Sequence, residues 1–216
     1  MNYKAMALAT AVLACAANAH AFEMYGTLGT EGLGYGIGVG VTRHVGVRTD
    51  VNGLALSHSF TAGDVRYDGK ARFVHGGIYA DFFPAPSSFP IRLTAGMLVG
   101  NDHVDLVGHA VQGTYVYRGV AYSTAGQSVN GRITLPTVRP YLGIGFGHTP
   151  EGTPGWSMSF DAGVAYGRPK VEVDVPPLIV AVVGQATVDD QRQQLQDKAD
   201  RLKFYPVVKL GVTYRW

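Results

Sequence analysis

The chain has 216 residues, enough for one domain with a sizeable interior, and only 16% of them are charged, well below the roughly 25% of ordinary soluble domains. The net charge of +2 is small and no basic cluster is interleaved with aromatic residues, so the composition argues against nucleic-acid binding. Glycine is abundant, with 29 residues.

The N-terminal segment predicts export from the cytoplasm. Lys4 is the only charged side chain in residues 1–22, an apolar run covers residues 5–17, and the small residues Ala19 and Ala21 follow it. This arrangement is typical of a secretory signal peptide, and its apolar run is too short to span a bilayer. We therefore predict a signal peptide over residues 1–21, cleaved after Ala21, and one domain over residues 22–216. The alternative is a lipoprotein signal in which Cys15, the single cysteine, carries the lipid.

Alternation with a period of two residues dominates the rest of the chain. Between Gly32 and Gly40, glycine alternates with larger apolar residues, and residues 142–147 repeat the pattern. Such a period indicates strands with two different faces. A nucleotide-binding G-x-G-x-x-G loop does not fit, because Val39 and His148 occupy the place of its last glycine. We expect these glycines on the inner face of a narrow barrel, where they make room for large neighbours.

The alternation predicts eight strands, which lie near residues 23–30, 33–42, 45–58, 70–83, 90–101, 137–148, 156–174 and 204–216. Short turns are expected on the periplasmic side at residues 42–44, 84–90 and 149–155. Longer extracellular connections are expected at residues 59–69, 102–136 and 175–203.

Isolated charges occur on the strand faces opposite the apolar ones. In a barrel these faces line the lumen, which in an eight-stranded barrel is just wide enough to be filled by side chains. We expect a structural network of paired charges, with a gated pathway as the alternative. Its predicted members are Arg48, Asp50, Asp81, Arg92, Asp161, Lys209 and Arg215.

The end of the chain is an amphipathic strand that stops on an aromatic residue. One face of residues 204–216 carries Leu210, Val212, Tyr214 and Trp216. With the signal peptide and residues 46–52 and 139–147, this segment resembles the outer-membrane β-barrel domain family, whose members include the OmpA- and OmpW-like barrels. The usual terminal Phe of that family is here Trp216.

The resemblance implies an all-β, antiparallel, up-and-down transmembrane barrel of about eight strands in the outer membrane of a Gram-negative bacterium. It also implies that the last strand is an assembly signal for the barrel-insertion machinery, that periplasmic chaperones assist, and that lipid and lipopolysaccharide surround the folded protein. No nucleic-acid partner and no cofactor are expected, and the oligomeric state stays open.

One helix is predicted in the last connection, over residues 187–203. Leu195, Ala199 and Leu202 form a narrow apolar stripe on it, and an apolar run over residues 177–184 precedes it. Two interpretations remain open: a cap over the barrel mouth, or a patch that binds lipid or a hydrophobic small molecule.

A second candidate hairpin lies within the connection at residues 102–136. Tyr115, Tyr117 and Tyr122 with Arg118 give it the aromatic and arginine composition of contact surfaces. Alternatively, these tyrosines only extend two barrel strands above the membrane.

The function predicted from these features is structural, or one of surface interaction presented by extracellular loops. The alternative is a conduit for small solutes or hydrophobic molecules. A lipid A-modifying or proteolytic barrel enzyme is a further alternative, based on the pairs His58–Ser59 and Asp102–His103 near strand ends. We predict no enzyme, because no G-x-S-x-G motif and no metal-ligand spacing occur.

Overall fold

The computed structural model describes residues 21–62, 65–86, 91–110, 114–117, 120–123, 128–149, 153–177, 180–181 and 184–216. The predicted signal peptide, with Ala19, lies outside the described residues except for Ala21, which begins the first strand. The described elements are β1 (Ala21–Gly29), β2 (Gly32–Gly40), β3 (Val45–Ala62), β4 (Val65–Phe82), β5 (Ile91–Gly100), β6 (His103–Ala110), β7 (Thr114–Tyr117), β8 (Val120–Ser123), β9 (Ser128–Thr134), β10 (Val138–Phe146), β11 (Gly155–Tyr166), β12 (Lys170–Asp174), α3 (Gln185–Asp200) and β13 (Phe204–Arg215).

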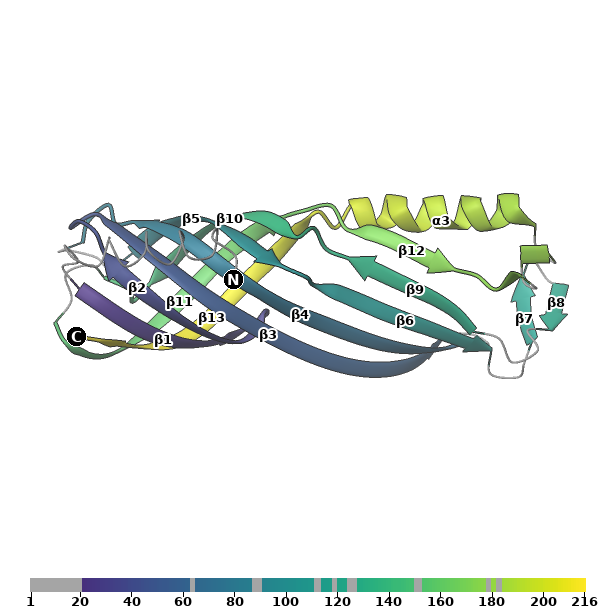
Figure 1. Cartoon of the computed structure of the whole chain (residues 1–216), viewed down its shortest axis with the longest axis horizontal. Helices are drawn as coiled ribbons and strands as arrows, with labels where there is room; N and C mark the ends of the chain where they lie inside the picture. The colour runs from purple at the N-terminus through teal and green to yellow at the C-terminus, as the bar shows by residue number, and fades with distance from the viewer. Residues whose placement is uncertain are drawn as a thin grey trace, which may run out of the picture.

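Eight strands close into an antiparallel barrel, seen on the left of Figure 1. Their order around the ring is β1, β2, β3, β4, β5, β10, β11 and β13, and β13 pairs with β1. These are the eight predicted strands, so the predicted fold, an all-β, up-and-down transmembrane barrel with a helix in a connection, is confirmed. Among the described residues, no helix is long and apolar enough to cross a lipid bilayer.

The two-residue period places apolar side chains outside the barrel and polar ones inside. In β13, Leu210 and Val212 are 59% and 49% exposed, whereas Lys209 and Thr213 are 5% and 0% exposed. The other barrel strands also expose large apolar side chains on their outer faces, and together these side chains form an apolar band around the barrel. Such a band is the lipid-facing surface of a transmembrane barrel.

Inner-face glycines make room for large aromatic rings. A Cβ at Gly36 would collide with the ring of Tyr25, and a Cβ at Gly77 would collide with Tyr79. Both tyrosines are buried in the lumen. The expectation that glycine serves this purpose is confirmed.

The turn of the first hairpin is very tight. Only Thr30 and Glu31 separate β1 from β2, and Gly32 follows them with a φ of 89°. A Cβ there would collide with the backbone oxygen of Gly53, so both the backbone conformation and the space favour glycine.

Two strands continue far beyond the barrel. β3 and β4 have 18 residues each, against 9 in β1 and β2. Their outer halves pair with each other, and β4 pairs with β6, β6 with β9 and β9 with β12, which gives a five-stranded sheet that projects from the barrel mouth (Figure 1). We call this sheet the arm; it consists of residues 54–62, 65–73, 103–110, 128–134 and 170–174.

The arm corrects three predicted boundaries. Residues 59–69 and 102–136 were expected as connections without barrel strands, but they supply most of the arm. The predicted strand 156–174 is divided into β11 and β12. Between them, the amide of Gly167 bonds to Lys203, and Pro169 has no amide to donate to a ladder.

The predicted helix is present, with shifted bounds and a different packing. It begins at Gln185, and its buried apolar residues are Val188 and Ala199, whereas Leu195 and Leu202 of the predicted stripe are exposed. Figure 1 shows α3 alongside β12, at the edge of the arm. The interpretation of this helix as a cap over the barrel mouth is therefore wrong.

Candidate functional site: the buried charge network

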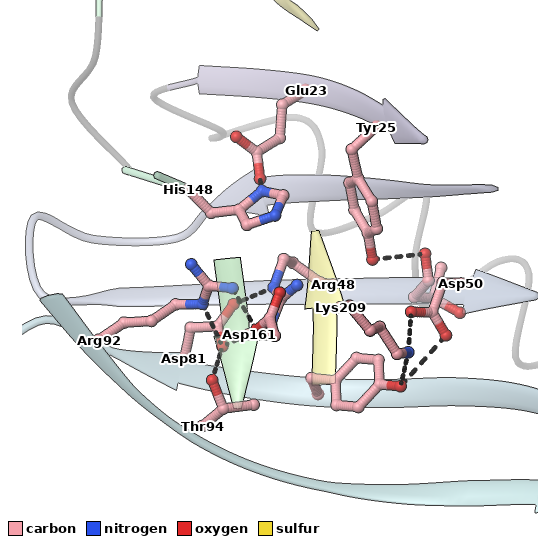
Figure 2. A network of polar contacts seen from close by, with 12 residues as sticks. Glu23, Tyr25, Arg48, Asp50, Asp81, Arg92, Thr94, His148, Asp161 and Lys209 are labelled. Atoms are coloured by element: carbon pink, nitrogen blue, oxygen red, sulfur yellow. Dashed lines mark hydrogen bonds and ion pairs between the residues drawn. The ribbon is translucent and has the colours of Figure 1, made fainter. Parts of the chain in front are cut away.

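Four charged side chains from four strands meet across the lumen (Figure 2). Arg48 of β3 pairs with Asp81 of β4 and lies 3.4 Å from Asp161 of β11. Arg92 of β5 pairs with the same two carboxylates, lying 3.4 Å from Asp81. Thr94 donates a hydrogen bond of 2.6 Å to Asp81. We call the four charged residues the four-charge cluster; two cations and two anions alternate in it and neutralise one another.

A second group lies at the end of the barrel where β1 begins and β13 ends. Glu23 is 3.3 Å from Arg215 and also contacts His148, which is fully buried after the end of β10. The imidazole of His148 lies edge-on to Tyr25, with ring centroids 4.7 Å apart. This group closes one end of the lumen.

Lys209 pairs with one carboxylate inside the lumen and with another at the mouth of the barrel. Its ammonium lies 3.0 Å from Asp50 and 2.7 Å from Glu31, and it donates to the hydroxyl of Tyr79 at 3.2 Å. Asn52 donates to Asp50 at 2.8 Å. One cation thus pairs with two carboxylates, one on β3 and one in the turn between β1 and β2.

At the mouth, His75 bridges two further carboxylates. Its two ring nitrogens lie 2.9 Å from Glu31 and 2.9 Å from Asp102, and Asp102 also pairs with Arg139. Burial would raise the pKa of Asp102, but His75 and Arg139 outweigh it and hold that pKa below its usual value. The pKa of Glu31 is lowered in the same way, because His75 and Lys209 outweigh its burial. We call this group the His75 bridge.

The buried charges nearly balance. Among the described residues, six buried carboxylates face five buried Arg and Lys side chains. Two cavities within this network hold about 10 Å³ each, about the space of one water molecule. Paired charges and large side chains therefore fill the barrel interior.

All seven charges predicted for the lumen are placed inside it. Each is at most 5% exposed, and each takes part in one of the contacts above.

Sequence reasoning missed several members of the network, notably Glu23, Glu31, His75, Arg139 and His148. Three of them could have been found by extending the alternation: Glu23 is in phase with the inward Tyr25 on β1, and His75 and Arg139 are in phase with inward residues of β4 and β10. Glu31 and His148 lie outside strands, where the two-residue period gives no signal.

The residues of the predicted assembly signal lie on the outer surface. Leu210, Val212 and Trp216 are exposed, and Tyr214 is half-buried. The ring of Tyr214 packs edge-on against Trp216 at 4.8 Å, and Trp156 lies 5.0 Å from Tyr214. These rings form an aromatic group where the barrel strands end.

The predicted loop hairpin exists as β7 and β8, which pair only with each other. Tyr115 is registered opposite Tyr122, and Tyr117 lies at the end of β7. Arg118 lies outside the described residues. The alternative in which these tyrosines extend barrel strands is wrong, because the hairpin is a separate two-stranded sheet.

The two pairs that suggested hydrolysis are engaged in other contacts. The ring of His58 stacks on Phe60 at 6.4 Å, and Ser59 donates to Asp68 at 2.6 Å. Asp102 belongs to the His75 bridge, while His103 lies 3.8 Å from Asp105 on the arm. In the part of the chain that the structure describes, no group of three or more His, Cys, Asp or Glu side chains could hold a metal ion.

Comparison with known proteins gives relatives in structure alone. No family model matches the chain, and no curated protein matches it in sequence. The structure of CarO from Acinetobacter baumannii matches with a TM-score of 0.59 at 20% identity, covering 90% of this chain and 97% of CarO. The structure of CarO2 from the same organism matches with a TM-score of 0.59 at 22% identity, covering 91% and 98%. At this identity the likeness shows a shared barrel fold over nearly the whole of both chains.

Proposed function

We propose that the chain is an outer-membrane protein whose barrel spans the lipid and whose arm projects outside the cell. The exposed apolar band and the aromatic group at the strand ends support this placement. The even strand number supports it too, since short turns then face the periplasm and longer connections the outside. In biogenesis the partners are periplasmic chaperones and the insertion machinery; lipid and lipopolysaccharide surround the folded barrel.

Its role is structural and interactive, neither enzymatic nor conductive. The observation that carries this proposal is the four-charge cluster, which joins β3, β4, β5 and β11 across the interior. Solutes cannot pass without separating paired, buried charges, and separating them is costly. The barrel then anchors the arm, which is the part that meets partners.

Planar-bilayer recording tests this proposal. Wild-type protein that is heat-modifiable on SDS gels should give no steady current at moderate voltage. The neutral double variant Arg92→Ala/Asp161→Ala should conduct measurably, while the exposed pair Arg132→Ala/Asp105→Ala on the arm should stay silent as the control. Regular current steps from wild-type protein would favour the conduit instead.

A further inference from the structure

The two faces of the arm differ sharply in polarity. Neighbours across a β-sheet share a face, so register identifies each face. One row crosses all five strands: Leu56 opposite Ala71, then Val104, Ile133 and Val171. This row is apolar throughout, and it continues the side that faces the lumen in the barrel. We call this side the arm's inner face.

The adjacent row, on the opposite side of the sheet, is polar throughout. It consists of Ser57, Lys70, Asp105, Arg132 and Glu172 in the same strand order. Arg132 and Asp105 form an ion pair within it. A barrel wall has its polar face inside and its apolar face outside, so the arm reverses the polarity of the barrel. This reversal suits a sheet whose outer side meets water.

The inner face keeps apolar surface exposed. Leu56 and Phe60 are 57% and 46% exposed, and Phe60 stacks on Tyr67 with ring centroids 5.2 Å apart. The helix α3 packs against β12, the edge strand of the sheet, where Gln196 accepts from the amide of Val171 and Arg192 donates to the carbonyl of Val173. An apolar surface of this kind in water marks a binding site.

The area of the inner face indicates how large a binding partner it can accommodate. Five strands spaced about 4.8 Å apart are about 19 Å wide, and the six-residue step from Leu54 to Phe60 adds about 20 Å of length. The resulting area of about 400 Å² is half of the roughly 800 Å² that each partner of a stable dimer buries. It suits a small molecule, and the row that crosses the sheet carries no charge to pair with an ionic group.

We propose that the arm's inner face binds a neutral molecule with an extended hydrocarbon chain, outside the membrane. The site begins where the barrel ends, and the buried, paired side chains of the His75 bridge occupy the lumen beneath it. The ligand is therefore held on the arm and does not enter the barrel. This inference rests on the proposed placement of the arm outside the cell.

Photolabelling of the full chain in phosphatidylcholine nanodiscs tests the proposal, with a neutral twelve-carbon alkyl diazirine as the probe and peptide mapping as the readout. Labelling of arm peptides should saturate and be displaced by excess dodecanol, whereas labelling of the lipid-facing band should not saturate. Leu106 lies on the inner face, two residues from Val104 on β6, and is half-buried, whereas Leu56 is exposed. Leu106→Ser and Leu56→Ser should each reduce arm labelling at least about tenfold. Val107→Ser is the matched control, because Val107 is registered opposite Asp68 on the polar side.

Each outcome bears on the inference. Saturable labelling that is lost in Leu106→Ser and kept in Val107→Ser supports it. The inference is overturned if arm labelling is absent, if it does not saturate, or if it falls equally in Leu106→Ser and Val107→Ser. Cross-linking of the arm to a second copy of the chain would also overturn it. Labelling of the lipid-facing band distinguishes failure of this inference from failure of the proposed membrane placement. If the arm is labelled and the band is not, only the membrane placement is contradicted.

Discussion

The four-charge cluster shares each carboxylate between two guanidinium groups. Asp161 contacts both Arg48 and Arg92, and Asp81 contacts the same two. Each anion therefore compensates the burial of two cations. Loss of one member leaves a buried charge without sufficient compensation, which is more costly than loss of a complete pair.

Asp161→Ala should therefore destabilise the barrel strongly. We expect a loss of about 3–5 kcal/mol in the free energy of unfolding, since Arg48 and Arg92 would retain only Asp81 between them. Urea titration in lipid vesicles measures this change. Asp105→Ala removes the exposed partner of Arg132 and should cost less than about 1 kcal/mol. Similar losses in both variants would contradict the role assigned to the cluster.

The His75 bridge predicts sensitivity to acid. The pKa values of Glu31 and Asp102 are lowered in the folded protein, so the stability they contribute is complete above their unfolded pKa values, near about 4. That stability is lost as the pH falls through the folded values. We expect the urea midpoint of the wild type to fall steeply below about pH 4.

The double variant Glu31→Gln/Asp102→Asn should show a shallower fall over the same pH range, although it is less stable at pH 7. Asp189→Asn, on the exposed surface of α3, is the control and should follow the wild type. If the urea midpoint falls with pH equally steeply in the double variant and the wild type, these two carboxylates do not cause the acid sensitivity.

At the scale of elements, the sequence predicts the barrel strands well because their alternation has one polarity. Leu210 and Lys209 on β13 show it plainly: one meets lipid and the other the lumen. The arm strands alternate too, but with the polarity reversed, so the apolar residues of β3 and β4 change face where these strands leave the barrel. Their partners are also distant in sequence, as Val104 with Ile133 shows.

The charge network was predictable in part for the same reason. Alternation assigns Arg48 or Asp161 to the inner face, but it does not state which charges meet. The pairing of Arg48 with Asp161 depends on the closure of the ring, which brings β3 and β11 across one lumen. The His75 bridge also needs a turn residue, Glu31, whose position no period predicts.

Deleting Trp216 should reduce insertion into the outer membrane. Its indole packs with ring centroids 5.4 Å from Phe22 of β1 and 4.8 Å from Tyr214 of β13, so it contacts the first and the last strand of the barrel. We expect lower outer-membrane levels and more periplasmic degradation, measured by fractionation and immunoblotting. Leu202→Ala, an exposed residue outside the barrel strands, is the control. Normal levels of the truncated chain would refute this role.

The edge of β12 should be protected by α3. Gln196 binds the amide of Val171 and the carbonyl of Pro169, and Arg192 binds the carbonyl of Val173. Uncovered strand edges pair with other chains. Gln196→Ala/Arg192→Ala should therefore increase self-association, measured by sedimentation in detergent. Gln194→Ala, which loses only a contact with Asp190, should stay unchanged, and equal behaviour of the two variants would contradict this assignment.

In the complete protein, we expect the barrel to provide stability and the arm to provide recognition. The ring of eight strands closes through pairs that involve neither β6 nor β9, and its interior is held by its own charges. The arm takes no part in closing the ring, so its surface is free to vary with the partner. Stability and recognition should therefore be separable by deletion.

Replacing residues 104–133 with a short turn should separate them. The change removes most of β6 and β9, so the five-stranded sheet of the arm is disrupted and only its β3–β4 hairpin and β12 remain, while every pair of the barrel ring is kept. The trimmed protein should stay heat-modifiable and β-rich by circular dichroism. It should lose saturable labelling by the alkyl probe and any adhesion that the full chain confers on cells. If binding instead survives trimming and disappears only when Arg48, Asp161 or Arg215 is substituted, the lumen carries the function.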